Sequence, residues 1–214
     1  MNGITFGKKH TYDDWGLILV SKNIGMPQPK TLSVDVEGMD GSIDMSEALN
    51  GEIKFGNRSL SFEFTMTSEY DDFYELVSEI SNYLHGRKLR IIIDEDDDYY
   101  YLGRCVINQW ASNKRIGKIV IQCDCDPYKY QLKETAITAK ISGRTYVKVY
   151  GNRMTVSPKI YCSNDSISLI LGNESVALDQ GENEVLDLFI YEGNNTLVFE
   201  GDGNIKLTFH GGEL

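Results

Sequence analysis

Short segments in which apolar and polar residues alternate constrain the fold of this 214-residue chain more than any other feature. The alternation is clearest at residues 60–66 and 118–125, where every second residue is apolar. Successive side chains of a β-strand point to opposite faces of a sheet, so a period of two is typical of half-buried strands. The sequence therefore predicts a mainly β protein.

One segment has helical spacing instead. Its apolar residues recur on one helical face: Tyr70, Phe73, Tyr74, Val77, Ile80 and Leu84. Ser68 and Asp71 resemble a capping box that starts the helix, and Gly86 is an expected stop. His85 fits the last turn as a cation favoured by the helix dipole. The single apolar stripe predicts that this helix packs on a sheet.

The chain is expected to form two domains. Strands at Leu89–Ile93 and Tyr99–Trp110 follow the helix, and residues 118–125 complete an N-terminal domain of residues 1–132. Beyond it, turn residues recur roughly every 8–12 positions without a helix, which is typical of an all-β sandwich. These turns are Gly151-Asn152, Gly172-Asn173, Gly181-Glu182-Asn183, Gly193-Asn194-Asn195 and Gly201-Asp202-Gly203-Asn204. Residues 133–214 are therefore expected to form a small C-terminal β-sandwich.

A long polar stretch with glycines runs from Glu37 to Gly51, after an extended segment at Thr31–Val36. Structureless loops of this length are uncommon in compact domains unless they have a function. No Lys or Arg lies between Ser33 and Ile53. The acidic residues near the loop are Asp35, Glu37, Asp40, Asp44 and Glu47. We expect a long acidic loop with a functional role.

The net charge of −11 disfavours two classes of partner. Stable nucleic-acid binding concentrates Lys and Arg, and so does docking on an anionic membrane. The first residues do not resemble a signal peptide, and the apolar runs fall far short of the roughly 20 residues that a spanning helix needs. The expectation is a protein folded in a cytoplasm without nucleic-acid or membrane contacts.

The acidic run from Asp94 to Asp98 is the strongest candidate metal site. Asp94, Asp96 and Asp98 have the spacing that opens a calcium loop. Tyr99 occupies the position that requires glycine, and Cys105 replaces the bidentate glutamate. A solvated tip between two strands is the favoured interpretation.

The four cysteines are Cys105, Cys123, Cys125 and Cys162, and no C-x-x-C pair exists among them. Cys123 and Cys125 share one face of a strand, and a metal site that also includes Cys105 is one alternative. Buried small apolar residues are the favoured interpretation. The histidines His10, His85 and His210 are scattered, and Gly201-x-Gly203 opens no helix. No nucleophile or phosphate-loop motif is found. The sequence predicts no enzyme, no catalytic residue, no metal and no cofactor.

A sugar-binding surface is a separate alternative for the C-terminal domain, because many β-sandwiches of this kind bind carbohydrate. Its candidate residues are the tyrosines Tyr146, Tyr150, Tyr161 and Tyr191. Both tryptophans, Trp15 and Trp110, lie in the other domain. Half-buried strand tyrosines are the favoured interpretation.

A resemblance to a known family rests on motifs that agree in order and spacing. They are Gly3-Ile4-Thr5-Phe6-Gly7, residues 10–17, residues 34–44, Asn57-Arg58-Ser59-Leu60, Leu84-His85-Gly86-Arg87, residues 97–104, Gly201-Asp202-Gly203 and residues 210–214. Together they resemble the distal tail proteins (Dit) of siphophages and prophages of low-GC Gram-positive bacteria.

The resemblance implies an N-terminal tail-tube-like β-sandwich with one flanking helix and an extended loop, followed by a galectin-like or jelly-roll-like sandwich. It also implies a hexameric ring in the virion tail tip or baseplate, assembled in the host cytoplasm, that joins the tail tube to the hub and lets DNA pass. The implied partners are other copies of the chain, the tail tube protein, the tail-associated lysin or hub protein, the tape measure protein, and receptor-binding or baseplate proteins.

The alternative function is a carbohydrate-binding module of a cell-surface or secreted protein.

Overall fold

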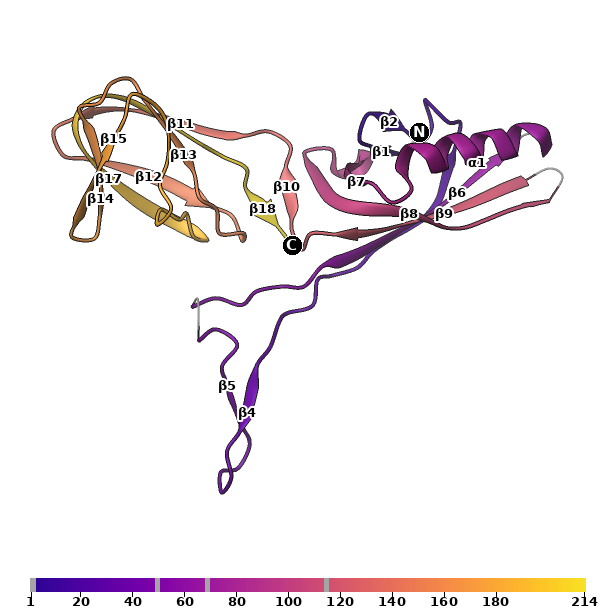
Figure 1. Ribbon diagram of the computed structural model, residues 1–214, viewed down its shortest axis with the longest axis horizontal. Helices are drawn as coiled ribbons and strands as arrows, with labels where there is room; N and C mark the ends of the chain where they lie inside the picture. The colour runs from indigo at the N-terminus through magenta and orange to yellow at the C-terminus, as the bar shows by residue number, and fades with distance from the viewer. Residues whose placement is uncertain (1–2, 49–50, 68–69, 114–115) are drawn as a thin grey trace. The chain divides into compact units, whose positions relative to one another are not determined.

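The computed structural model describes residues 3–48, 51–67, 70–113 and 116–214, apart from the side chains of residue 67, residues 70–72 and residue 113. The chain is mainly β with one helix, which confirms the predicted fold class (Figure 1). It divides into two compact units, Met1–Lys129 with Leu214, and Tyr130–Glu213. Within the described residues, no helix is long and apolar enough to cross a membrane.

The N-terminal unit is built on one antiparallel sheet with the strand order β2-β1-β7-β8-β9-β6-β3. Its strands are β1 (Ile4–Phe6), β2 (Lys9–His10), β3 (Ile18–Ile24), β6 (Arg58–Thr67), β7 (Lys88–Ile93), β8 (Tyr99–Asn113) and β9 (Ile116–Cys125). A short 3-10 helix, η1 (Asp94–Asp96), joins β7 to β8. The alternation predicted for β6 and β9 is confirmed, since Phe62 pairs with Ile121 and both are fully buried.

Helix α1 (Tyr70–Leu84) packs on this sheet through its predicted stripe (Figure 1). Phe73, Ile80 and Leu84 are buried in the same core as the strands. Gly117 of β9 makes room for the helix, because a Cβ there would lie 2.1 Å from the ring of Phe73. Ser68 of the predicted capping box lies outside the described residues.

His85, predicted to lie in the last turn of the helix, follows the last helical residue, Leu84. Its Nδ1 accepts a hydrogen bond from the backbone N–H of Ile107 on β8, at 3.1 Å. His85 therefore ties the end of the helix to the sheet.

The C-terminal unit is a sandwich of two antiparallel sheets, ordered β12-β17-β14-β15 and β11-β17-β13-β16. Its strands are β11 (Thr135–Ser142), β12 (Thr145–Gly151), β13 (Lys159–Cys162), β14 (Ile167–Leu171), β15 (Glu174–Leu178), β16 (Gly181–Glu184) and β17 (Gly193–Phe209). The short strands β10 (Lys129–Gln131) and β18 (Gly212–Glu213) pair with each other. Between the two sheets lies an apolar core that includes Phe199, Leu169 and Leu207.

Strand β17 corrects the predicted turn at residues 201–204. The strand continues through these residues, and its first half pairs in one sheet while its second half pairs in the other. The glycines provide the bend, with φ angles of 122° at Gly201 and 155° at Gly203. Side-chain-bearing residues rarely adopt such angles, so the glycines let one strand pass from sheet to sheet. The glycine motifs at 181–183 and 193–195 also lie within strands, β16 and β17.

Candidate functional site

Strands β3 and β6 pair with each other in the sheet. Residues 25–57 connect them and form an arm that extends away from the sheet (Figure 1). The two legs of the arm run side by side near its base. The backbone N–H of Gly56 donates to the oxygen of Gln28 at 2.8 Å, and that of Lys30 donates to the oxygen of Lys54 at 2.7 Å. Backbone hydrogen bonds and the bridge between Pro29 and Phe55 therefore join the two legs at the base of the arm.

Arg58 anchors the base of the arm. Its side chain is only 3% exposed. Its Nε donates to the backbone oxygen of Gly25 at 2.9 Å, and an Nη donates to that of Pro127 at 3.3 Å. The guanidinium also lies over the ring of Tyr101, 5.1 Å from its centroid, and burial raises the pKa of this tyrosine. Arg58 thus joins the first leg of the arm to the end of β9.

The tip of the arm is a hairpin of β4 (Ser33–Asp35) and β5 (Ser42–Asp44). The sequence predicts a long polar loop from Glu37 to Gly51, and the structure places the short strand β5 inside that range. Val34 pairs with Ile43 across the hairpin. Beyond this pair, the backbone N–H of Met45 donates to the oxygen of Leu32 at 2.8 Å, which extends the ladder.

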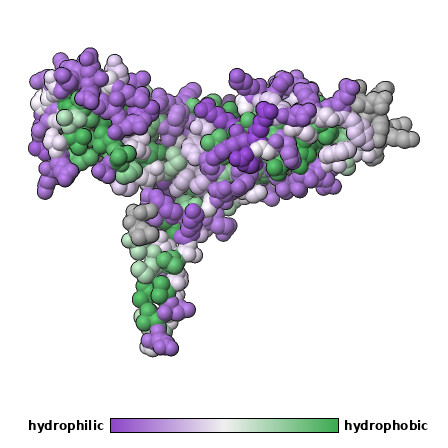
Figure 2. Space-filling view, viewed as in Figure 1, coloured by the Kyte–Doolittle hydropathy of each residue, from purple (hydrophilic) through white to green (hydrophobic). Residues whose placement is uncertain are grey.

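One face of this hairpin is apolar and exposed. Alternate residues of a strand share a face, and the cross-strand pairs align these faces. The members of this apolar face are Leu32, Val34, Val36, Ile43 and Met45, each between 40% and 57% exposed. Figure 2 shows hydrophobic side chains gathered along the arm. Met39, in the turn, is exposed as well.

The opposite face of the hairpin is polar and acidic. It carries Ser33, Asp35, Ser42 and Asp44. Asp44 accepts hydrogen bonds from the side-chain hydroxyl and the backbone N–H of Ser46, and these bonds lower its pKa below the ordinary value. The arm therefore presents two chemically different surfaces on a thin ribbon.

A two-stranded ribbon is marginally stable alone in water and usually needs something packed on its apolar face. Exposed apolar surface that gathers on one element marks an interaction site. The sequence prediction of a polar loop misses this face. The alternation at Leu32, Val34 and Val36, resumed at Ile43 and Met45 after a glycine-bearing turn, is the pattern that indicates it.

The first carboxylates of the acidic run bind different parts of the fold. Asp94 accepts the backbone N–H of Gly3 at 2.8 Å and lies 3.2 Å from His10 Nε2. Asp96 pairs with Lys129 at 2.8 Å. Asp94 and Asp96 therefore have separate partners, while Asp97 and Asp98 are exposed to solvent.

The cysteines are free and buried, as the favoured interpretation predicts. Cys105 and Cys123 face each other across β8 and β9, with their sulfurs 3.4 Å apart. The hydrogen bond from Cys123 to Cys105 and burial raise the pKa of the Cys123 thiol, and burial raises the pKa of Cys125 to about 12. Within the described residues, no group of three or more His, Cys, Asp or Glu side chains is placed to hold a metal ion.

The remaining candidates are separated in the fold. His10, His85 and His210 lie on different elements, and His210 Nδ1 lies 2.9 Å from the backbone oxygen of Gln131. The four tyrosines proposed for sugar binding are more exposed than expected, at 52–66%. Tyr146 and Tyr150 lie on one sheet of the C-terminal sandwich, and Tyr161 lies on the other.

The fold defines a class of protein: a helix-bearing sheet with a long hairpin arm, joined to a small β-sandwich. No protein-family model and no curated protein sequence matches the chain. Among solved structures, the Dit protein (gp 19.1) of SPP1 is similar, with a TM-score of 0.73 over 100% of both chains at 13% identity. That protein is described as a paradigm of the hub adsorption apparatus in Gram-positive infecting phages. The chain therefore has a Dit-like fold.

A second solved structure, the conserved protein of unknown function PA5104 from Pseudomonas aeruginosa PAO1, has a TM-score of 0.27. It is 11% identical and is matched over 91% of this chain and 98% of that one. A likeness this weak carries no argument.

Proposed function

We propose that this chain is a distal tail protein, a structural component of the tail tip of a phage or phage-like particle. In this role it forms a hexameric ring that joins the tail tube to the tip hub and lets DNA pass. Its partners are other copies of the chain, the tail tube protein, the tail-associated lysin or hub protein and the tape measure protein, with receptor-binding or baseplate proteins further out. The Dit-like fold over the whole chain supports this role.

The apolar face of the arm is the observation that carries the proposal. A ring needs each subunit to present a surface that a neighbour covers. The arm supplies such a surface at the end of an anchored ribbon, and the pair Val34 and Ile43 lies at its centre. Fully burying an aliphatic side chain of this size contributes about 1.5–3 kcal/mol. We place this face against the next copy in the ring.

The chain is proposed to be structural rather than catalytic, with no cofactor. Three of its thiols are poor nucleophiles: the hydrogen bond to Cys105 and burial raise the pKa of Cys123, and burial raises the pKa of Cys125 and Cys162. The thiolate is the reactive form of cysteine, and a raised pKa depletes it.

The test compares substitutions on the two faces of the hairpin. Val34→Thr with Ile43→Thr removes apolar surface and keeps β-branched residues that suit strands. Ser33→Thr with Ser42→Thr is the matched control on the polar face. Native mass spectrometry and analytical ultracentrifugation of the full chain, with and without the tail tube and hub proteins, give the assembly state.

We expect the wild-type chain and the control to form hexamers, at least with the partner proteins present. The apolar-face variant should need about a hundredfold more protein to assemble, because it loses roughly 3 kcal/mol per interface. If every mixture contained only monomers or dimers of the chain, the ring proposal would be wrong. Equal weakening by both variants would show that the apolar face is not the contact.

A further inference from the structure

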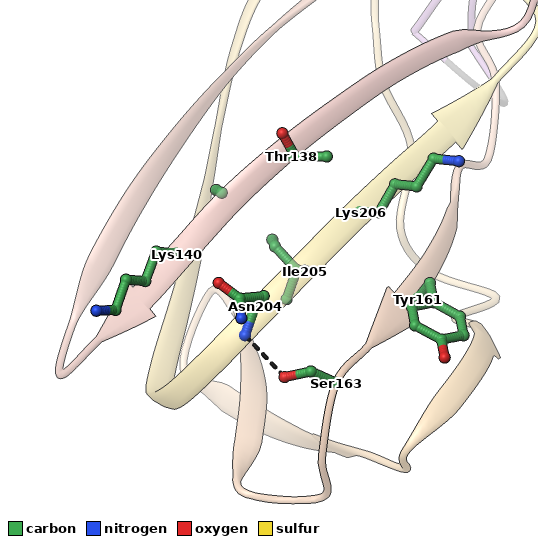
Figure 3. Close-up of a pocket in the computed structure, with 8 residues that line it drawn as sticks. Thr138, Lys140, Tyr161, Ser163, Asn204, Ile205 and Lys206 are labelled. Atoms are coloured by element: carbon green, nitrogen blue, oxygen red, sulfur yellow. Dashed lines mark hydrogen bonds between the residues drawn. The ribbon is translucent and has the colours of Figure 1, made fainter.

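A shallow groove lies on the outer face of the sheet β11-β17-β13-β16, with a volume of about 350 Å³. Three strands supply its walls (Figure 3). Thr138, Lys206 and Tyr161 form one row across β11, β17 and β13, and Lys140 with Asn204 forms the next row. We call this surface the tyrosine–lysine groove, and its polar lining is Thr138, Lys140, Tyr161, Ser163, Asn204 and Lys206.

The groove offers an aromatic ring to a ligand. Tyr161 is 55% exposed although it lies in the middle of a sheet face. A tyrosine ring packs against the C–H groups of a flat ligand, and its hydroxyl remains available for a hydrogen bond. Sugar rings have this mixture of C–H faces and hydroxyl edges. Tyr161 is therefore suited to stack on a saccharide.

The floor of the groove is polar and held in place. The backbone N–H of Asn204 donates to Ser163 Oγ at 2.9 Å, and the N–H of Ser163 donates to the Asn204 oxygen at 2.9 Å. These two bonds fix the end of β13 against β17. The amide of Asn204 lies beside this fixed point, and the hydroxyl of Thr138 lies in the neighbouring row with Lys206 (Figure 3). Amides and hydroxyls both donate and accept, as sugar hydroxyls require.

The charge of the groove is opposite to that of the chain. The chain has 32 acidic and 21 basic residues. The groove is lined by two lysines and by no acidic residue. Glu182 is the cross-strand partner of Tyr161 on the far side, but it pairs with Lys159 at 2.7 Å. A local positive surface on an acidic chain favours a negatively charged ligand.

The two lysines lie at opposite ends of the groove, on either side of Asn204 (Figure 3). A ligand that carries more than one negative charge along its length matches this arrangement. The volume lies at the lower end of the range of about 300–1,000 Å³ that is usual for ligand sites.

We propose that the tyrosine–lysine groove binds an acidic oligosaccharide, whose sugars carry carboxylate or phosphate groups. Tyr161 stacks on a sugar ring, Asn204 and Thr138 bind its hydroxyls, and Lys140 and Lys206 bind the charges. This inference does not rest on the ring, because the groove lies wholly within the C-terminal unit.

Calorimetric titration of the full chain tests the proposal with four probes: a galacturonic acid trimer, a short polymer of sugars joined by phosphate, neutral maltotriose and inorganic phosphate. Tyr161→Ala and Lys206→Gln are the groove variants. Tyr146→Ala and Lys148→Gln are matched controls, because both residues are exposed on the outer face of β12 in the other sheet. All four positions are exposed, so each variant is expected to fold, which circular dichroism checks.

We expect at least one acidic saccharide to bind the wild-type chain, with an affinity that falls as salt rises. Each groove variant should weaken this binding at least tenfold, and each control should leave it within twofold. Binding of neither acidic saccharide overturns the proposal. So does equal binding of maltotriose or inorganic phosphate, or equal weakening by the controls. Oligomeric state is measured separately, so failure of this site and failure of the ring are distinguishable.

Discussion

Single side chains hold the arm at both of its ends. At the base, the guanidinium of Arg58 donates hydrogen bonds to two backbone oxygens and lies over the ring of Tyr101. Near the tip, Asp44 fixes the chain as it leaves β5 by binding Ser46 twice. The sequence does not indicate that Arg58 is buried. A buried guanidinium depends on acceptors that are distant in the chain, here Gly25 and Pro127, which no local pattern contains.

Asp44 gives a prediction about pH. Hydrogen bonds from Ser46 favour the charged carboxylate and hold the pKa of Asp44 below its ordinary 3.8. The stability that these bonds add is present above that value and is lost as the pH falls through the folded pKa. Ser46→Ala should therefore move the Asp44 midpoint up toward 3.8.

Carboxyl chemical shifts followed by NMR during an acid titration measure this midpoint. Ser42→Ala is the control, because it lies in the same hairpin and does not bind Asp44. An Asp44 midpoint that is the same in all three proteins would contradict the role of Ser46.

At the scale of elements, alternation predicts the strands well and fails where one strand serves two sheets. In β6, β9 and α1, the spacing of the apolar residues in the sequence matches the face that each element buries. In β17 the glycines at 201 and 203 resemble a turn, because turns and bends both need glycine. Only pairing with β11 and β12 decides between a turn and a bend, and such pairing is not local. The apolar face of the arm is not predicted from the sequence for a similar reason, because its residues on β4 and on β5 come together only when the two strands pair.

Gly201 should be intolerant of any side chain. Its φ of 122° strains other residues, and a Cβ there would lie 1.9 Å from the backbone oxygen of Ser166. Gly201→Ala should lower the free energy of unfolding by more than the roughly 1–3 kcal/mol that backbone strain alone costs. Chemical denaturation of the purified chain measures this loss.

Gly143 supplies the matched control, because its φ is 61° and no atom lies within 4 Å of a Cβ built there. Gly143→Ala should therefore show the strain without the clash and lose less stability than Gly201→Ala. Equal losses for the two variants would mean that the close approach to Ser166 is relieved by a small shift.

At the scale of the whole molecule, the proposed ring must let DNA pass without holding it. DNA carries one negative charge per roughly 1.7 Å, so cations facing the channel would bind its phosphates. The acidic face of the arm carries Asp35 and Asp44, and its apolar face is assigned to the neighbouring copy. We therefore expect acidic residues of the arm to face the channel or its rim.

The assembled protein should then fail to retard duplex DNA in gel electrophoresis at low salt. The double variant Asp35→Lys with Glu37→Lys should retard it, because each introduced cation releases counterions from the duplex. Clear retardation by the wild-type assembly, or none by the variant ring, would place these side chains away from the channel.

The hairpin at the tip of the arm has a consequence for how such proteins diversify. Strands β4 and β5 pair with each other, so residues can be added to or removed from both of these strands without disturbing the register of β3 on β6. Adding two residues to each strand lengthens the hairpin by about 7 Å and leaves its existing side chains on the same faces, since side chains repeat every second residue. Adding one residue to each strand at its base turns the apolar face over. Hairpin length can therefore change only in even steps if the apolar face is to keep its orientation.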